Sequence, residues 1–321
     1  MLGLYNKQGG LYIASHDPTA SVKKISTSTD QEKVNFQFNW PAPNMGIDNN
    51  GYKLPGNVVL GYVEGTWYEA AMIYQAWVKQ EAPWWPKAPC KRPSRIQDIA
   101  VWVQHESGGD LKTLVEEVLD FAEFMRVPIG FHWYVWHKIP FDNDYPHFFP
   151  AKEGFVKAVR ELEDSGVRVM PYINGRLWDA DLDDFKSEGI KAVTKNEKGE
   201  PYIEDYGNGV RNAVMNPVTE IWQKKIKEIV LRLQKDSGTS GVYLDQISAA
   251  SPKLCMDRSH GHPLGGGSWW LDQGYYKLLS AIREEMPEGA FLTSEAMALS
   301  LIHISEPTRP RLISYAVFCL K

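Results

Sequence analysis

Between residues 93 and 298, short apolar runs alternate with segments whose apolar residues recur every three or four positions. The apolar runs are IAVWVQ, IGFHWYVW, VRVMPYIN, GVYLDQI and AFLTSEA. Parallel strands need long crossover connections, which are usually helices, so this alternation predicts a parallel α/β sheet. Polar residues follow every strand, which favours a (β/α)8 TIM barrel over a doubly wound sheet. The chain contains about five β/α units, so we expect a truncated barrel.

The helical segments carry boundary signals of their own. Asp110 precedes a segment with helical periodicity and is expected to be its N-cap. Asn216 and Pro217 predict the start of a later helix, with Pro217 at its first position. That helix is expected to bury five apolar side chains: Trp222, Ile226, Ile229, Val230 and Leu233.

The first 86 residues have a different character. Short alternating runs such as GLYIASH and VNFQFNW are separated by Gly, Pro and Asn, which predicts antiparallel β-structure. The segment GTWYEAAMIYQAWVKQ then switches to a helical period, and the proline-rich stretch 82–93 predicts a linker. We therefore expect one domain over residues 1–86, with part of a β-sandwich and a connecting helix, and a barrel domain over 87–298.

The segment from Leu299 to Lys321 has no amphipathic period and no capping signals. Its strings LSLIHISEPTR and ISYAVFCL are the translation of a common sequencing adapter. We therefore expect residues 299–321 to be a non-native tail and the native part to stop after Ala298. Strands six to eight of a barrel would then be absent, and the open edge predicts poor folding and an inactive fragment.

Composition narrows the class of partner. The net charge is −5 and no block of like charges occurs, so neither a nucleic acid nor a membrane surface is an expected partner. The sequence contains no run of 18 apolar residues, so it predicts no membrane span. No signal peptide is evident at Met1, and the localisation stays open. The 12 Trp and 15 Tyr favour carbohydrate, because sugar rings stack on aromatic faces. The three cysteines have neither disulfide nor metal-ligand spacing, and we interpret Cys90 and Cys255 as bystanders.

In TIM barrels the chemistry lies at the carboxyl ends of the strands. Here those ends are rich in polar and aromatic residues. The candidate substrate-binding residues at these positions are Trp102, His105, His132, Tyr134, Trp136, Tyr172, Asn174, Arg176, Asp179 and Gln246. Either Trp136 or Trp178 is expected to be a stacking platform for a sugar, and Trp133 is expected in the core.

Two acids end neighbouring strands. Asp245 follows an uncharged run, and Glu295 follows the next strand. Glycoside hydrolysis requires such a pair, one ionised and one protonated, and strand tips about 5 Å apart match a retaining mechanism. The alternatives are an ion pair of Asp245 with Arg176 or Arg258, and a helix-capping role for Glu295.

The order of several strings resembles a family of bacterial barrel glycosidases of uncharacterised specificity. These strings are HWYVWHKIPFDNDYPHFFPAKEGF, VMPYINGRLWD, GVYLDQI, SHGHPLGGGSWW and LTSEAMA, and the resemblance covers about residues 60–298. The family is similar in layout to the endo-α-N-acetylgalactosaminidases and more remotely to the α-galactosidase and α-glucosidase superfamily. The resemblance implies that Asp245 is the nucleophile, that Glu295 is the general acid/base, and that the first 86 residues are the tail of a β-sandwich.

The pair His260 and His262 allows two interpretations. We expect the two imidazoles to hydrogen-bond sugar hydroxyls, and the alternative is a metal-dependent hydrolase that uses both as ligands. The sequence thus predicts a retaining glycoside hydrolase that needs no cofactor and no metal. The alternative from another class is a non-catalytic carbohydrate-binding barrel.

Overall fold

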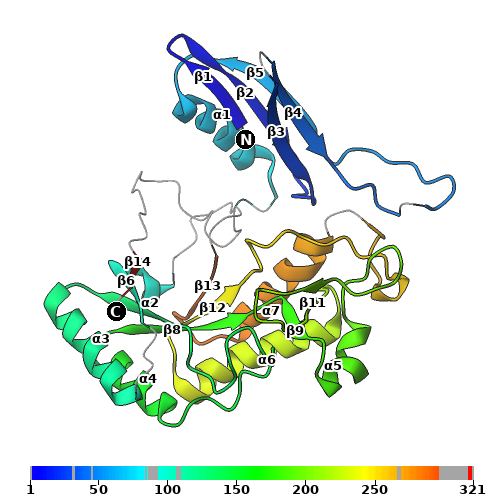
Figure 1. Ribbon diagram of the computed structural model, residues 1–321. Coiled ribbons are helices and arrows are strands. Elements are labelled where there is room, and N and C mark those ends of the chain that lie inside the picture. The colour runs from blue at the N-terminus through cyan, green and yellow to red at the C-terminus, as the bar shows by residue number, and fades with distance from the viewer. Residues whose placement is uncertain are drawn as a thin grey trace.

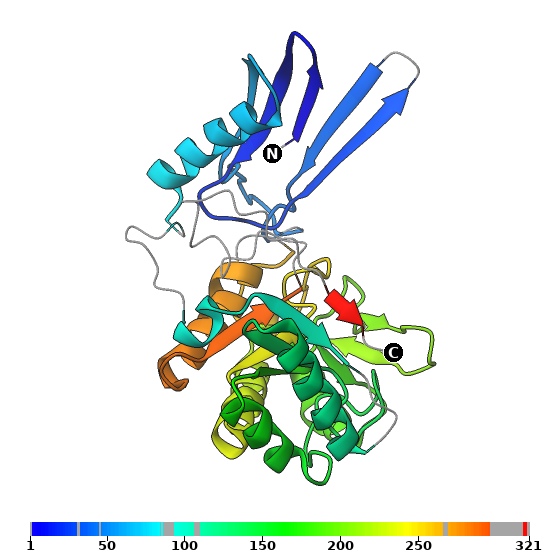
Figure 2. The same ribbon diagram turned by 90° about the vertical axis from the view of Figure 1, so that its left-hand side faces the viewer.

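The fold is described from a computed structural model of the 321-residue chain. The structure describes residues 2–30, 33–44, 46–83, 85, 93–105, 110–265, 269–295 and 317–319. Figures 1 and 2 show the N-terminal strands with one helix at one end of the molecule, and a larger α/β part at the other. None of the helices in these ranges is long and apolar enough to cross a bilayer.

A parallel sheet forms the centre of the α/β part. Its strands are β6 (Val101–Gln104), β7 (Ile129–Trp133), β8 (Arg168–Asn174), β12 (Gly241–Asp245) and β13 (Phe291–Ser294). They lie side by side in chain order, and every neighbouring pair is parallel. The prediction of parallel strands from the alternating pattern is therefore confirmed.

Helices α3 (Leu111–Met125), α4 (Phe155–Asp164), α6 (Glu220–Ser237) and α7 (Lys277–Glu285) connect these strands. Asp110 caps α3 as predicted, since its carboxylate accepts a 2.8 Å hydrogen bond from the Thr113 amide. The predicted start of α6 at Pro217 is wrong, because the helix begins at Glu220. The Asn216 side chain instead accepts a hydrogen bond from the Val218 amide, 3.1 Å away, which forms a turn before the helix.

The two faces of the parallel sheet differ in chemistry. The face toward the helices is apolar and fully buried, and it includes Val103, Phe131, Val169, Val242 and Leu244. All five side chains predicted to face inward from α6 are buried there, as expected from their spacing. Because successive side chains of a strand alternate, the other face carries the polar and aromatic residues.

Between β8 and α6 the chain adds elements that the sequence pattern does not predict. Strands β9 (Leu177–Asp179), β10 (Ile203–Glu204) and β11 (Asn212–Val214) form a small antiparallel sheet. The short helices α5 (Asp183–Ser187) and η1 (Gly189–Lys191) lie in the same excursion. After β12 follow η2 (Arg258–His260) and η3 (Trp269–Tyr276).

The N-terminal part has the expected antiparallel strands and helix. Strands β1 (Leu2–Asn6), β2 (Gly9–His16) and β5 (Asn57–Val63) form one sheet, and β3 (Lys24–Asp30) pairs with β4 (Lys33–Asn39) in another. Helix α1 (Trp67–Glu81) packs on the first sheet through Ala70, which meets Tyr12, Ala14 and Val63 in a small apolar cluster. The assignment of this part to a β-sandwich domain stays a prediction.

Two further segments complete the description. The short helix α2 (Ser94–Gln97) precedes β6. Strand β14 (Val317–Cys319), from the segment expected to be a non-native tail, pairs in parallel with β6. Residues 296–316 lie outside the described ranges.

Candidate active site

Asp245 ends β12 on the polar face of the parallel sheet. The register pairs Asp245 with Asn174, the last residue of β8. From the same strand, the hydroxyl of Tyr172 donates a 2.8 Å hydrogen bond to Oδ2 of Asp245. Tyr172 is almost completely buried, so this hydrogen bond holds the carboxyl group in a fixed position.

Glu295 reaches Asp245 from the neighbouring strand. The register of β12 and β13 pairs Leu244 with Ser294. The next residues of the two strands, Asp245 and Glu295, therefore lie side by side at the carboxyl edge of the sheet. The two carboxyl groups lie close enough for the charge of Glu295 to raise the pKa of Asp245. The structure therefore brings together the two acids that the sequence predicted to be neighbours.

Burial is the main reason that the pKa of Asp245 rises to about 6. The negative charge of Glu295 raises this pKa further, whereas the hydrogen bond from Tyr172 opposes the rise. A carboxyl group with this pKa exchanges its proton near neutral pH, as general acids and bases of active sites do.

The backbone at Glu295 is held by Ser248. The Ser248 hydroxyl is within hydrogen-bond distance of the Glu295 carbonyl oxygen, to which it can donate its proton, and its Oγ lies 2.8 Å from Oγ of Ser294. The Glu295 side chain itself is exposed. Glu295 thus has a backbone held by Ser248 and a side chain exposed to solvent.

Aromatic rings line the polar face beside Asp245. Tyr134 stacks on Tyr172 with ring centroids 4.9 Å apart, and Tyr172 stacks on Tyr243 at 6.0 Å. His132 packs against Tyr243, with centroids 4.3 Å apart. Sequence reasoning left Tyr243 out of the candidate site, although strand alternation places it on the same face as Asp245.

Two side chains in this group have polar atoms available for a ligand. Burial lowers the pKa of His132 to about 3, so its imidazole is neutral, and its Nε2 has no hydrogen-bond partner among the described residues. Asn174 accepts hydrogen bonds from the amides of Arg176 and Leu177, but its Nδ2 has no partner within the described ranges. Buried polar atoms without a partner are rare in folded proteins, so these two nitrogens are candidates for hydrogen bonds to a ligand.

Arg176 does not pair with Asp245. Its guanidinium forms two hydrogen bonds with Glu204, of 2.6 and 2.9 Å, and a third of 3.1 Å with Oε1 of Gln246. Because Arg176 is only 1% exposed, it positions Gln246 and β10 rather than offering a surface to a substrate. The alternative role of Asp245, an ion pair with Arg176, is therefore not what the structure has.

The predicted tryptophan platforms lie in the core. Trp136 is fully buried against Phe155, and its indole N–H donates to the Tyr172 carbonyl. Trp178 is also fully buried and packs against Trp222. Neither ring therefore has a free face for a sugar. The sequence pattern did not reveal this, since it cannot distinguish a buried tryptophan from an exposed one.

Three other residues that were predicted to bind substrate contact other protein groups and not the carboxyl pair. Trp102 packs edge-on against Phe291, the first residue of β13, and so lies at the opposite end of the strands from Asp245. His105 pairs with Glu117 on α3, 2.5 Å away. Both carboxylate oxygens of Asp179 accept hydrogen bonds from backbone amides, those of Asp144 and Asp181, so Asp179 orders loops.

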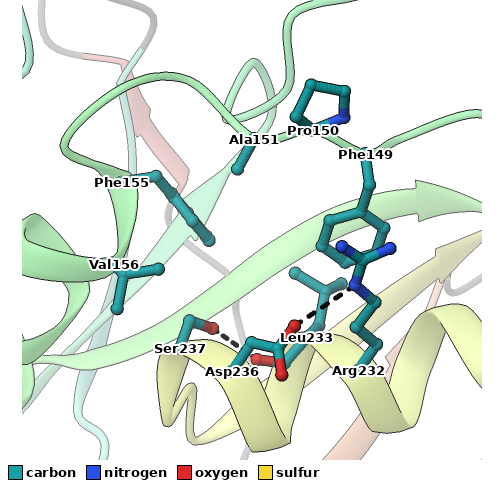
Figure 3. Close-up of a pocket in the computed structure, with 9 residues that line it drawn as sticks. All are labelled: Phe149, Pro150, Ala151, Phe155, Val156, Arg232, Leu233, Asp236 and Ser237. Atoms are coloured by element: carbon teal, nitrogen blue, oxygen red, sulfur yellow. Dashed lines mark hydrogen bonds and ion pairs between the residues drawn. The ribbon is translucent and has the colours of Figure 1, made fainter.

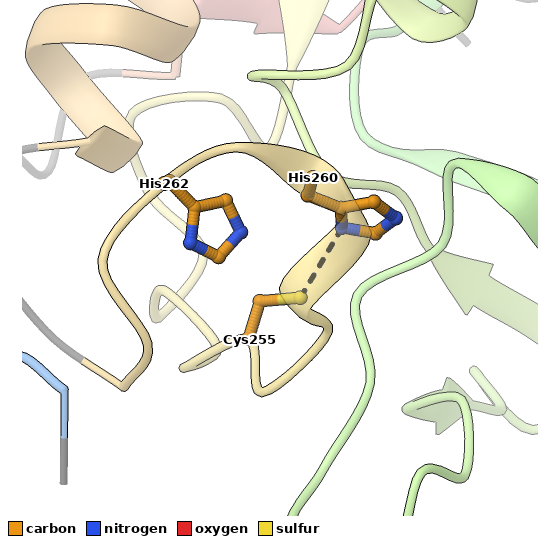
Figure 4. A group of neighbouring side chains, drawn as sticks. All are labelled: Cys255, His260 and His262. Carbon is orange, nitrogen blue, oxygen red and sulfur yellow. Dashed lines mark hydrogen bonds between the residues drawn. The ribbon is translucent and has the colours of Figure 1, made fainter. Parts of the chain in front are cut away.

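His260 and His262 are buried side chains on the loop after β12, together with Cys255 (Figure 4). Both imidazoles bond to the Asn216 amide, so they are not available to sugar hydroxyls as the sequence analysis expected. Sγ of Cys255 lies 3.4 Å from Nδ1 of His260. The interpretation of Cys255 as a bystander is therefore wrong, because the fold of the loop places the imidazole of His260 beside its thiol.

A pocket of about 180 Å³ lies between α4, the end of α6 and residues 149–151 (Figure 3). Phe149, Phe155 and Leu233 give it an apolar wall, and Arg232 pairs with Asp236 at 3.2 Å. None of the candidate site residues lines it. The candidate active site is therefore defined by the carboxyl pair at the strand ends and not by this cavity.

A comparison with known protein families identifies a match over residues 52–305. The matching family is described as a domain of unknown function, DUF6259. The chain belongs to this family. The match covers all five parallel strands and both carboxyl groups of the candidate site, and it extends past Ala298.

Two curated relatives carry provisional names as glycoside hydrolases. A protein of Bacteroides thetaiotaomicron is 31% identical over 302 residues, which cover 92% of this chain and 44% of the relative. A protein of Monosiga brevicollis is 27% identical over 334 residues, which cover 92% of this chain and 28% of the relative. The chain thus spans less than half the length of either relative. The family is glycoside hydrolase-like, as the resemblance in the sequence implied.

Solved structures share the fold at low sequence identity. An α-N-acetylgalactosaminidase from Bifidobacterium bifidum in complex with GalNAc matches with a TM-score of 0.70 and 12% identity, over 91% of this chain and 49% of that one. An α-galactosidase from Thermus thermophilus in complex with stachyose matches with a TM-score of 0.57 and 16% identity, over 91% of this chain and 54% of that one. These similarities establish the mixed α/β fold with its parallel sheet.

Proposed function

We propose that the protein is a glycoside hydrolase that cleaves O-glycosidic bonds with retention, with Asp245 as nucleophile and Glu295 as general acid/base. The observation that carries the proposal is the pair of carboxyl groups at the adjacent ends of β12 and β13, beside a layer of aromatic rings. The glycoside hydrolase names of the family relatives support the reaction class.

In the first step, a carboxylate oxygen of Asp245 attacks the anomeric carbon. The bond from that carbon to the leaving oxygen breaks, and the leaving oxygen takes the electron pair of the bond and the proton of Glu295. A pKa of about 6 leaves roughly nine-tenths of Asp245 ionised at pH 7. The hydrogen bond from Tyr172 favours this ionised form.

In the second step, the Glu295 carboxylate takes a proton from water, and the resulting hydroxide oxygen attacks the anomeric carbon. The bond to Asp245 breaks and its electron pair returns to the carboxylate. Retaining pairs lie about 5 Å apart, with the anomeric carbon between the two carboxyl groups. Tyr172 holds the Asp245 carboxyl group by its hydrogen bond, and the Glu295 side chain is exposed beside it.

The unpaired nitrogens of His132 and Asn174 are proposed to hydrogen-bond the sugar. Tyr134 and Tyr243 are proposed as the aromatic wall of the subsite, since they are only partly buried. The parallel sheet is proposed to be the first part of a TIM barrel, because its five strands keep chain order and place their polar face away from the helices.

The test is turnover of a panel of aryl glycosides by the full-length protein. The panel includes α-N-acetylgalactosaminides and α-galactosides, the substrates named for the structural neighbours. We expect Asp245→Asn to lower kcat/KM at least about 1,000-fold, since the covalent step has no other nucleophile. Asp257→Asn is the matched control, because Asp257 pairs with Lys195 outside the site.

The same panel separates the alternative function. Full-length protein that binds sugars with no turnover on any glycoside would show a non-catalytic carbohydrate-binding barrel. Turnover that survives Asp245→Asn would overturn the assignment of the nucleophile. Product analysis by NMR gives the anomer first formed, and inversion would overturn the retaining mechanism.

A further inference from the structure

The loop after β12 brings three metal-ligating side chains to one point. Sγ of Cys255 and one nitrogen each of His260 and His262 lie within 4.8 Å of one another (Figure 4). The thiol of Cys255 is fully buried, and the side chain of His260 is 3% exposed. None of these groups takes part in the proposed hydrolysis.

Backbone carbonyls fix the orientation of both imidazoles. Nε2 of His260 lies 3.0 Å from the Lys191 carbonyl, and Nδ1 of His262 lies 3.0 Å from the Pro263 carbonyl. A carbonyl only accepts, so each of these nitrogens carries the proton. The lone pairs are then on Nδ1 of His260 and Nε2 of His262, the two atoms that face Cys255. Histidine ligands of metals are typically oriented by such second hydrogen bonds.

Both lone pairs converge on the Asn216 amide. Nδ2 of Asn216 lies 2.9 Å from Nδ1 of His260 and 2.9 Å from Nε2 of His262. The NH2 group of Asn216, whose two hydrogens carry partial positive charge, therefore occupies the position that a cation would take. A cation can enter here if the Asn216 amide rotates, which breaks the hydrogen bond from the Val218 amide to its Oδ1.

We propose that Cys255, His260 and His262 form a binding site for a zinc-type divalent cation. One thiolate and two neutral imidazoles are ligands that zinc prefers, and they do not suit Mg²⁺ or Ca²⁺. Tetrahedral zinc places sulfur and nitrogen ligands about 3.6 Å apart. The distance of 3.4 Å between Sγ of Cys255 and Nδ1 of His260 already matches this spacing. Water or the amide oxygen of Asn216 completes the fourth position.

The cation would tie three segments together. These are the loop after β12, the end of η1 at Lys191, and the turn before α6 at Asn216. All three follow β8 along the chain, and the loop after β12 begins directly after Asp245. The site does not contribute a group to the chemistry at Asp245, so the proposal is independent of the proposed hydrolysis.

The metal content of the full chain tests the proposal. We expect about one zinc per chain by mass spectrometry of elements after growth with added zinc and extensive dialysis. Cys255→Ser and His262→Ala are expected to lower the zinc content at least fivefold. Cys90→Ser is the control and is expected to retain zinc. Folded protein with less than about one zinc in ten chains, or equal zinc in all four proteins, would overturn the proposal.

Cobalt provides a measurement that does not depend on the folding of variants. We expect Co²⁺ added to the zinc-free, unmutated chain to give tetrahedral visible bands and a thiolate-to-cobalt charge-transfer band. We also expect zinc to raise the melting temperature of this chain, since a ligand of the folded state stabilises it. A cobalt spectrum without the thiolate band would overturn the site, and so would a melting temperature that zinc leaves unchanged.

Discussion

At the scale of single residues, the candidate site depends on how Asp245 is surrounded. Burial and the Glu295 charge disfavour the ionised carboxylate, and the Tyr172 hydroxyl favours it. The balance leaves a pKa of about 6, so a small change in the surroundings changes the ionised fraction at neutral pH. Nucleophilic attack needs the carboxylate, so this balance controls the proposed reaction.

The pH dependence of kcat/KM follows from this pKa. We expect activity of the full-length protein to fall as the pH drops through about 6, because protonated Asp245 cannot attack. Tyr172→Phe removes the hydrogen bond that stabilises the carboxylate and is expected to move this acid limb upward by about one pH unit. The measurement is a pH profile of kcat/KM for both proteins.

Phe141→Leu is the control for this experiment. Phe141 touches the Tyr172 ring, with centroids 5.2 Å apart, but it is not among the groups that shift the pKa of Asp245. The acid limb of the kcat/KM profile of Phe141→Leu is expected to stay near pH 6. An acid limb that stays near pH 6 in Tyr172→Phe would contradict the role given to the tyrosine hydroxyl.

At the scale of elements, the buried ion pair of Arg176 and Glu204 joins the end of β8 to β10. Burial raises the pKa of Glu204, but the hydrogen bonds and charge of Arg176, together with hydrogen bonds from Tyr206 and Lys253, outweigh it and lower this pKa to about 2. A carboxyl group whose pKa is lowered by folding stabilises the native state above its unfolded pKa, near 4.5. This contribution is lost as the pH falls from about 4.5 to about 2.

We expect Arg176→Met to lower the free energy of unfolding by about 3 kcal/mol at pH 7, because it leaves Glu204 partly buried without its main partner. The double variant with Glu204→Leu is expected to recover at least half of this loss, since both charges are then removed. Urea denaturation at pH 7 and pH 3 measures both effects. Equal losses in the single and double variants would contradict the pairing.

At the scale of the whole molecule, the parallel sheet has unequal edges. Among the described strands, β13 has only β12 beside it, whereas β6 is also paired with β14. Of the segment 299–321, the structure describes β14, whose three residues pair with β6. A pairing of three residues is short, so we expect it to contribute little to stability.

We expect a chain that stops after Ala298 to melt within about 2 °C of the full chain, because the pairing of β14 with β6 that it loses spans just three residues. Differential scanning calorimetry of the two chains measures this. A fall of more than about 5 °C would contradict the expectation that residues 299–321 are a non-native tail, and would make β14 a stabilising strand of the sheet.

Local patterns in the sequence determined the elements of this protein and the order in which they occur. Alternating runs predicted the five parallel strands, helical spacing predicted the buried face of α6, and Asp110 predicted a cap. The two acids were predictable because each directly follows an apolar strand. Such patterns are local, since they depend on backbone geometry within a few residues.

Only the tertiary structure decided which polar and aromatic side chains meet. Trp136 entered the core and Tyr243 joined the carboxyl pair, although both lie on strand-end segments of similar character. Cys255, His260 and His262 met at Asn216, some 40 residues away along the chain, because the loop after β12 folds back onto the turn before α6. Contacts between distant segments depend on packing and loop closure, for which neighbouring residues carry no periodic signal.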